Sequence, residues 1–416
     1  VKMYGTEEQK RKWLPRAAKQ VTAFLLTEAD VGSDPARLGT TATPDGDDYI
    51  LDGVKLWTTN GVVADLLVVM ARVPKGDGHR GGISAFVVEA DSPGITVERR
   101  NQFMGLRGIE NGVTRLHHVK VPAENLIGRE GDGLKIALTT LNAGRLSIPA
   151  MAAGSAKWAL KIAREWSCER VQWGKPVGEH AAVAGKISFI AATSYALEAV
   201  LDLSGQMADE GRNDIRIEAA LAKLWSSVMA CAISDELVQI RGGRGYETAE
   251  SLAARGERAV PVEQLVRDLR INRIFEGSDE IMRLLIAREA VDAHLTAAGD
   301  LANANANPRQ KARAAVGASG FYAKWLPQLA FGEGQLPAAY REFGKLAAHL
   351  RFVERSSRKL ARNTFYGMAR WQAELEHKQG FLGRVVDIGA ELFAMSAACV
   401  RAEAQRAADP AKGAQA

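Results

Sequence analysis

Cysteine is scarce in this sequence, and the few cysteines are scattered. The 416 residues include only Cys168, Cys231 and Cys399, with no Cys-x-x-Cys pair among them. This spacing argues against a zinc site and favours a reducing compartment. We therefore predict no bound metal, and we expect all three thiols to be buried like small apolar side chains.

Long apolar runs and a strong excess of one charge are also missing. No run approaches the roughly 18 apolar residues of a membrane span, and we recognise no signal peptide. The net charge of +5 is mild for this length, so it permits acidic small molecules without favouring nucleic acid. We find no internal repeat. With these classes excluded, the length and composition predict a globular chain of two or three domains.

The pattern of apolar and polar residues changes along the chain and predicts a fold of the α+β class in which helices predominate. Alternating and β-branched runs separated by Gly, Pro and Asp predict antiparallel strands, in a sandwich or a barrel. Long Ala-rich periodic segments predict a helical bundle. Because the chain begins with Val1, we expect that an upstream segment is missing. The expected segments are a helical remnant with a break at Pro15 (1–20), a β-domain (21–129), a bundle (130–294), a polar linker (295–312) and a helical extension with a disordered tail (313–416).

The segment Ile271–Arg288, INRIFEGSDEIMRLLIAR, is the most informative one. It predicts an extended approach, a turn broken by glycine, and an amphipathic helix with Ser278 as its N-cap. Glu276 stands between Phe275 and Gly277, where a carboxylate can face a cavity while the phenyl ring excludes water. The alternative is a solvated carboxylate that favours the positive end of the helix dipole.

Two glycine-rich segments do not predict phosphate-binding loops. Gly76–Gly81 fits the GxGxxG pattern, but a strand follows it where a dinucleotide site needs a helix, so we expect a hairpin loop. Arg241–Gly245 lacks the Lys-Ser/Thr ending of a phosphate loop.

Three further segments could bind a flat or phosphorylated partner. In Phe24–Asp34 a strand enters a loop of small residues that suits an anion or the edge of a ring, or that forms an ordinary turn. Trp57 ends a strand before two threonines, where it could stack on a ring or simply close a hairpin. Arg170 lies in a turn between two helices, where it suits a phosphate or serves as a solvated cap.

Taken together and in this order, these segments resemble the acyl-CoA dehydrogenase family over roughly residues 1–292. The matching stretches are LTEADVGSD, KLWTTNG, VKVPAENLIG, RVQWGKPVGEH, QIRGGRGY and RIFEGSDEIMRLLIAR. The resemblance implies an N-terminal helical domain, a middle β-domain and a C-terminal four-helix bundle. The helical extension and the FEG form of the elbow are similar to the very-long-chain branch.

The resemblance implies FAD as cofactor, lying between the β-domain and the bundle of a homo-oligomer, either a dimer or a tetramer. Its isoalloxazine ring would contact one set of residues, and its adenosine and pyrophosphate end would be held by residues of a partner subunit. The ring set is Phe24, Leu26, Thr27, Gly32, Ser33, Trp57, Thr58 and Thr59; the second set is Arg170, Trp173, Gln239, Gly242 and Gly243; Ser278 and Glu280 would bind just beyond the elbow.

The resemblance also implies a reaction. Glu276 corresponds to the base that removes the α-proton of an acyl-CoA thioester, while a hydride passes to the flavin and gives a trans-2-enoyl-CoA in fatty-acid β-oxidation. Burial would raise the pKa of Glu276, and fixed donors would stabilise the enolate oxygen. Some relatives carry the base at the position of Gly144, and glycine cannot serve. The residues implied to contact substrate are Ser33, Asn142, Arg145, Phe275 and Gly277.

Partner and compartment follow from the same resemblance. Electrons would pass to an electron-transfer flavoprotein, in the cytoplasm of a bacterium or in the mitochondrial matrix of a eukaryote. The small residues Ala143, Gly144 and Ala150 favour a long acyl chain. Two alternatives are an acyl-CoA oxidase that uses oxygen and a non-catalytic assembly or scaffold protein. A basic helix at about 351–362 could lie on a membrane, although a helix packed on the bundle is the favoured interpretation.

Overall fold

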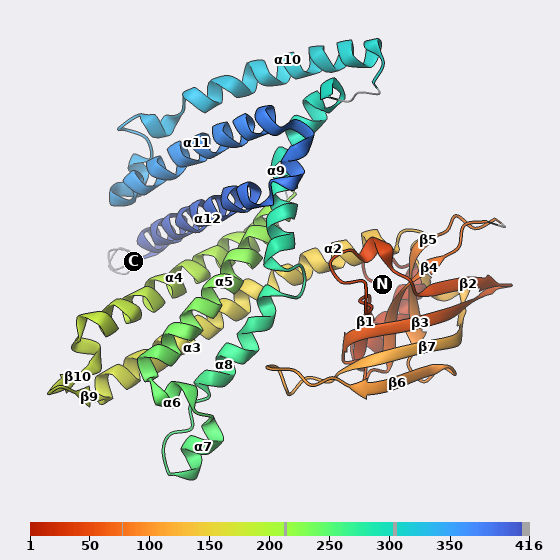
Figure 1. Cartoon of the computed structure of the whole chain (residues 1–416), viewed down its shortest axis with the longest axis horizontal. Coiled ribbons are helices and arrows are strands. Elements are labelled where there is room, and N and C mark those ends of the chain that lie inside the picture. Colours follow the sequence, from red (N-terminus) through yellow and green to blue (C-terminus); the bar gives the residue numbers. More distant parts are fainter. Residues whose placement is uncertain (77, 212–213, 303–305, 410–416) are drawn as a thin grey trace. The chain divides into compact units, whose positions relative to one another are not determined.

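The computed structural model describes residues 1–76, 78–211, 214–302 and 306–409, apart from the side chains of residues 142, 143, 300 and 302. The chain divides into two compact units, Val1–Ala143 and Gly144–Ala416 (Figure 1). The first unit contains the predicted strands and also residues 130–143, which were assigned to the bundle; the second contains the rest of the predicted bundle and the extension.

The first unit is built on one eight-stranded, mostly antiparallel sheet. Its strands follow the order β6-β7-β3-β2-β4-β5-β8, and β1 pairs in parallel with β4. The helix α1 (Glu7–Ala17) precedes the sheet, and α2 (Gly133–Arg145) follows it. The strands are β1 (Thr22–Leu25), β2 (Thr41–Asp45), β3 (Asp48–Thr59), β4 (Leu66–Val73), β5 (Gly82–Glu89), β6 (Ile95–Arg100), β7 (Asn111–Pro122) and β8 (Leu126–Ile127).

Strand β4 is buried on both faces, which explains its nearly continuous apolar sequence LLVVMARV. Leu67 and Val69 point into one hydrophobic cluster of the sheet, whereas Leu66 and Met70 point into a second one. Trp13 of α1 belongs to that second cluster. The helical remnant is therefore packed on the sheet. The predicted break at Pro15 is wrong, because α1 continues through Pro15 to Ala17.

Among the described residues, four long helices and the shorter α8 form the body of the second unit. They are α3 (Ser147–Glu169), α4 (Ala181–Glu210), α5 (Arg216–Arg241), α8 (Val262–Leu269) and α9 (Asp279–Ala302). Short elements join them: β9 (Val171–Gln172), β10 (Lys175–Pro176), α6 (Gly243–Tyr246) and α7 (Ala249–Ala254). The extension adds α10 (Pro308–Ala330), α11 (Ala347–Trp371) and α12 (Gln379–Ala408), and α12 shares the bundle's hydrophobic core.

Two bundle helices, α4 and α5, are long and apolar enough to cross a membrane by length and composition alone. The sequence interpretation had recognised no such segment. The most apolar window is 39% buried in α4 and 67% buried in α5. Both helices contribute to the bundle core, through Leu197 and Val200 of α4 and Leu224 and Leu237 of α5. Core helices of a soluble bundle satisfy the same criterion.

The structure corrects the predicted linker at 295–312. Helix α9 runs on to Ala302, because the segment TAAGDLA contains good helix formers and no proline. Helix α10 begins at Pro308, where the side chains of Asn307 and Gln310 form a capping box. Residues 303–305 and 410–416, the latter including most of the predicted tail, lie outside the described residues.

Two other local predictions are wrong. The approach to Glu276 is a 3₁₀ turn at Arg270–Arg273 and not an extended segment. Asn272 stabilises this turn, because its side-chain amide donates to the Leu269 carbonyl. Of the cysteines, only Cys399 is buried; Cys231 is half-buried and Cys168 is exposed.

The basic helix of the extension, α11, is tied to its own preceding loop. Arg351 donates to the carbonyl of Ala339 at 3.0 Å, and Arg355 donates to that of Gly334 at 2.9 Å. Arg358 is ion-paired with Glu354 on the same helix. The favoured interpretation was a packed helix with a solvated basic face; these three arginines instead bind backbone carbonyls and a carboxylate.

Candidate active site

Glu276 lies on a backbone elbow that its own residue type disfavours. Its φ is +53°, a left-handed conformation that costs a non-glycine residue about 1 kcal/mol or more. Gly277 follows with a φ of +94°, and a Cβ at that position would collide with the Met282 side chain. Only glycine fits at 277, and the two consecutive left-handed residues turn the chain sharply from the 3₁₀ turn into α9.

Buried polar contacts hold this elbow in place. The fully buried Lys223 of α5 donates from Nζ to the Gly277 carbonyl at 2.6 Å. Ser278 caps α9, because the Ile281 N–H donates to its Oγ at 3.4 Å, which confirms the predicted N-cap. Asp279, also buried, accepts from Arg273 at 2.6 Å. The strain at Glu276 is therefore offset by surrounding contacts.

The carboxylate that the elbow presents is desolvated. Its Oε2 is buried and has no hydrogen-bond partner among the described residues. Burial raises the pKa of Glu276 above its usual value, and the charges of Arg145 and Lys223 oppose that rise. A Cβ built on Gly144 would lie 2.8 Å from Oε2 and 3.0 Å from Oε1. The carboxylate thus faces the end of α2 at a residue that has no side chain.

Two cationic side chains, Lys223 and Arg145, act on the charge of the Glu276 carboxylate, and the sequence analysis predicted this role for neither. Burial lowers the pKa of Lys223 to about 8, and burial also lowers the pKa of Arg145. Arg145 had been assigned to the substrate, and the structure places it where its charge acts on Glu276. A lysine inside the apolar stretch ALAKLW of α5 is the signal that could have revealed Lys223, since an unpaired buried lysine is rare. The side chain of Asn142 lies outside the described residues.

In the first unit, the structure joins two of the segments singled out in the sequence. The Leu56 N–H donates to the Thr27 carbonyl at 2.9 Å, which sets the end of β3 beside the loop after β1. Trp57 is 56% exposed with a φ of +55°, and Thr59 is exposed next to it. The Asn111 amide donates to the Trp57 carbonyl and to the Thr59 hydroxyl, which fixes this strand end. Thr58, between them, is buried.

A buried ion pair that we did not predict shapes this loop. Lys55 is fully buried and donates from Nζ to Glu28 at 2.8 Å, and burial lowers the pKa of Lys55 to about 8. Glu28 also accepts from the Thr40 hydroxyl at 2.5 Å and from the Gly39 N–H at 2.8 Å. The sequence signal was a lysine at an inward-facing position of the alternating strand β3.

The remaining predicted contacts gather at one end of the bundle. Trp166 links them, because its carbonyl accepts from the Arg170 N–H and its indole N–H donates to Ile240 in the last turn of α5. Trp173 is 90% exposed in the turn between β9 and β10. Gly144, which lies against the Glu276 carboxylate, precedes the first turn of α3, whereas Arg170 follows its last turn. About 34 Å of helix therefore separates Arg170 from the elbow within one subunit. The other residues predicted here, all exposed, are Gln239, Gly242 and Gly243.

Glu280 and Ser278 are engaged within the first turn of α9. Hydrogen bonds from its own N–H and from Ser278 lower the pKa of Glu280. Phe275, the predicted water-excluding ring, is 38% exposed.

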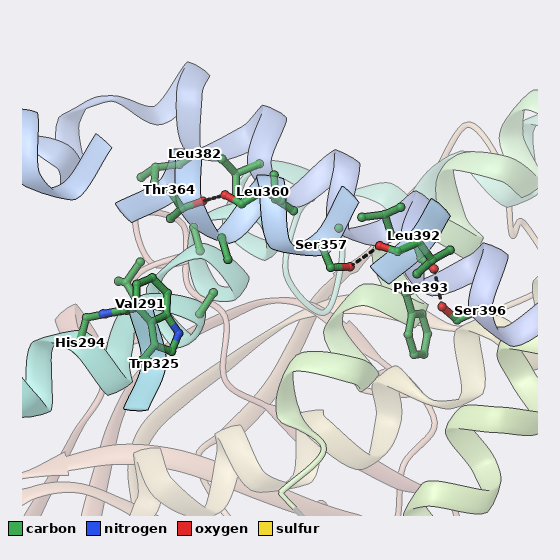
Figure 2. Close-up of a pocket in the computed structure, with 16 residues that line it drawn as sticks. Val291, His294, Trp325, Ser357, Leu360, Thr364, Leu382, Leu392, Phe393 and Ser396 are labelled. Atoms are coloured by element: carbon green, nitrogen blue, oxygen red, sulfur yellow. Dashed lines mark hydrogen bonds between the residues drawn. The ribbon is translucent and has the colours of Figure 1, made fainter. Parts of the chain in front are cut away.

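A cavity of about 400 Å³ lies elsewhere in the second unit, among α9, α10, α11 and α12 (Figure 2). His294 and Trp325 line one side, with ring centroids 4.5 Å apart, and burial lowers the pKa of His294. The hydroxyls of Thr364 and Ser396 donate to carbonyls of their own helices, which leaves an apolar lining. The cavity contains none of the predicted site residues.

Comparisons with known proteins match both the strands of the first unit and the helices of the second. A family model described as the acyl-CoA dehydrogenase middle domain matches residues 23–119, and one described as the acyl-CoA dehydrogenase C-terminal domain matches residues 131–291. The chain is 83% identical over 419 residues to a probable acyl-CoA dehydrogenase, FadE10, of Mycobacterium tuberculosis, covering all of this chain and 64% of that protein. It is 32% identical to the very long-chain specific mitochondrial acyl-CoA dehydrogenase of Bos taurus, over 96% of this chain and 60% of that protein.

A solved acyl-CoA dehydrogenase from Bacillus anthracis, complexed with FAD, superposes with a TM-score of 0.77 at 28% identity, over 98% of this chain and 66% of that one. This chain thus spans less than two thirds of the length of the curated relatives described above. Both family models, the relatives and the shared architecture agree that the chain belongs to the acyl-CoA dehydrogenase family.

Proposed function

We propose that this chain carries the flavin-binding and catalytic elements of an acyl-CoA dehydrogenase, with Glu276 as the base that removes the α-proton of the thioester. The single observation that supports this role most strongly is the buried, unpartnered Oε2 on a left-handed elbow. A carboxylate that only capped a helix would be solvated or would bind backbone N–H groups. This one is instead desolvated and opposite a glycine.

The surroundings of Glu276 adjust its proton affinity in two directions. Burial raises its pKa, which makes the carboxylate a stronger base once it has lost its proton. The charges of Arg145 and Lys223 oppose this rise in pKa and so favour the ionised form that a base requires. Lys223 also holds the carbonyl of Gly277, so the same residue fixes the elbow and supplies charge. A general base of this kind typically contributes about 10²- to 10⁴-fold to the rate.

The residues present fit FAD. Trp57 and Thr59 form an exposed strand end beside the Thr27 loop, where an aromatic ring and a hydroxyl can meet a flat polar partner. A Cβ at Gly32 would meet no described atom within 4 Å, so that loop is open to close approach. The exposed Trp173 and the half-buried Arg170 form a second aromatic and basic group, which suits the adenosine and phosphate end. When bound, FAD would supply the acceptor for the β-hydride.

Three finer proposals accompany this function. We propose a long acyl chain as substrate, because Gly144 adds no bulk beside Glu276 and the bovine relative, named as specific for very long chains, matches this chain through the extension. We propose a homo-oligomer, since Arg170 and the Glu276 elbow lie at opposite ends of α3 within one subunit. We propose an electron-transfer flavoprotein as the electron acceptor, as the family resemblance implies.

An anaerobic titration of the FAD-loaded protein with palmitoyl-CoA tests the proposal. We expect the flavin absorbance to bleach in the wild type, and the bleaching to be at least 10²-fold slower in Glu276→Gln. Glu374→Gln, which changes an exposed glutamate of the extension, is the matched control and should bleach at the wild-type rate. A protein that cannot be loaded with FAD, or equal rates for the two variants, would contradict the assignment.

A further inference from the structure

A β-bulge in the first unit brings three metal-ligating side chains together. Strand β3 pairs with β7 so that Leu51 faces Val119 and Gly53 faces Leu116. Asp52 therefore stands opposite two residues, His117 and His118. In a regular strand these consecutive histidines would point to opposite faces of the sheet. The extra residue and a φ of +51° at His118 place both of them beside Asp52.

The distances from Asp52 to the two imidazoles match those between the ligands of a tetrahedral metal site. Asp52 Oδ1 lies 3.5 Å from His117 Nδ1 and 3.3 Å from His118 Nδ1, and all three ligand atoms lie within 4.8 Å of one another. Ligands bound at about 2.0–2.1 Å with tetrahedral angles are themselves separated by roughly 3.3–3.4 Å. Little movement is needed to bring these atoms to a common centre.

The backbone around the cluster holds it in this arrangement. The His118 N–H donates to Asp52 Oδ1 at 2.9 Å, which orients the carboxylate as a supporting contact does in known metal sites. The His117 N–H donates to the Gly94 carbonyl at 2.9 Å, and the close approach of the His117 carbonyl leaves no room for a side chain at Gly94. The bulge is thus fixed from both of its neighbours in the sheet.

A surface ion pair explains this arrangement less well than a metal ion does. Both imidazoles are more than three-quarters exposed, and exposed pairs contribute about 0–1 kcal/mol. That gain is smaller than, or at most equal to, the cost of the left-handed backbone at His118, which is about 1–2 kcal/mol. Imidazole nitrogens with one carboxylate oxygen suit Zn²⁺ and similar transition metals, whereas Mg²⁺ and Ca²⁺ prefer oxygen ligands alone.

We propose that Asp52, His117 and His118 form a binding site for one Zn²⁺ ion, with a fourth position open to water or to an exogenous ligand. The proposed site differs from the prediction of no bound metal, which considered cysteine spacing only. It uses residues of the first unit that take no part in the proposed proton transfer, so it does not depend on the proposed function. Because the ion would bind the folded bulge, it should stabilise the first unit.

Calorimetric titration of the metal-free 416-residue chain with Zn²⁺ tests the site. We expect one ion per chain for the wild type and for His349→Asn, a control that removes an exposed histidine of α11. Asp52→Asn and His118→Asn should each weaken binding at least tenfold; asparagine tolerates the left-handed backbone at 118. Titration with Mg²⁺ should give no saturable binding.

A thermal melt provides a second readout. Zn²⁺ should raise the melting temperature of the wild type and of His349→Asn, and leave those of Asp52→Asn and His118→Asn unchanged. The metal-free variants must melt cooperatively, which shows that they are folded. The proposal is overturned if the wild type binds no Zn²⁺ with saturation, or if the Asp52 and His118 variants bind it as tightly as the wild type does.

Discussion

Replacing Gly144 by alanine should separate activity from stability in this protein. A Cβ at 144 would lie 2.8 Å from Glu276 Oε2, 3.0 Å from Oε1 and 3.2 Å from Cδ. To reach an ordinary contact near 3.4 Å, the carboxylate has to retreat by roughly 0.6 Å. Catalytic groups tolerate only about 0.5 Å of displacement, and an error of 1 Å can cost 10²-fold. We therefore expect the rate of flavin reduction to fall by about 10- to 100-fold.

The fold should survive this change. Gly144 lies in the last turn of α2, where alanine is favoured over glycine by up to about 1 kcal/mol. The matched control is Gly154→Ala in α3, where a Cβ meets no described atom within 4 Å. Both variants should melt at or above the wild-type temperature, and only Gly144→Ala should lose activity.

Anaerobic stopped-flow reduction, with butyryl-CoA and palmitoyl-CoA compared, distinguishes the possible causes. A displaced base slows both substrates by the same factor. A methyl group that merely obstructs the acyl chain slows palmitoyl-CoA alone, and that outcome would refute the reasoning about Glu276. Wild-type rates for Gly144→Ala with both substrates would refute it as well.

Other predictions concern the charges around the two sites. Glu276 must be ionised to act as a base, and burial raises its pKa. In a pH profile, kcat/KM should therefore rise along an acidic limb whose midpoint lies above the pKa of an ordinary glutamate. Lys223→Met removes a charge that lowers the pKa of Glu276, so this limb should move to higher pH; an unmoved limb would contradict the assignment. Glu28→Gln leaves Lys55 buried without its anionic partner. It should lower the free energy of unfolding of the first unit, measured by denaturant titration, by about 3 kcal/mol. The control Glu8→Gln changes an exposed glutamate and should leave that free energy nearly unchanged. The pKa of Glu28 is lowered in the folded protein. The ionised carboxylate therefore stabilises the fold above the unfolded-state pKa, and this stabilisation is lost as the pH falls through the folded-state pKa. Acidification should thus lower the free energy of unfolding less in Glu28→Gln than in the wild type.

Local sequence patterns predicted the elements well where the periodicity was strong. The alternation in DYILDGVKLWTT predicted β3, and the glycines at 76–81 fell in the loop between β4 and β5, as expected from the strand that follows them. The N-cap at Ser278 was also confirmed. The failures came where propensity was weak or was overridden: Pro15 is tolerated inside α1, and the predicted linker is partly helical.

The sequence by itself determined the family, the order of the segments and the choice of Glu276 over Gly144 as the candidate base, because these depend on residue identity and on short-range spacing. Tertiary structure alone decided what surrounds that base. Lys223 and Arg145 reach the elbow from other helices, and a bulge turns two adjacent histidines toward Asp52. Burial, desolvation and charge act through space between residues distant in the chain, so one-dimensional spacing could not reveal them.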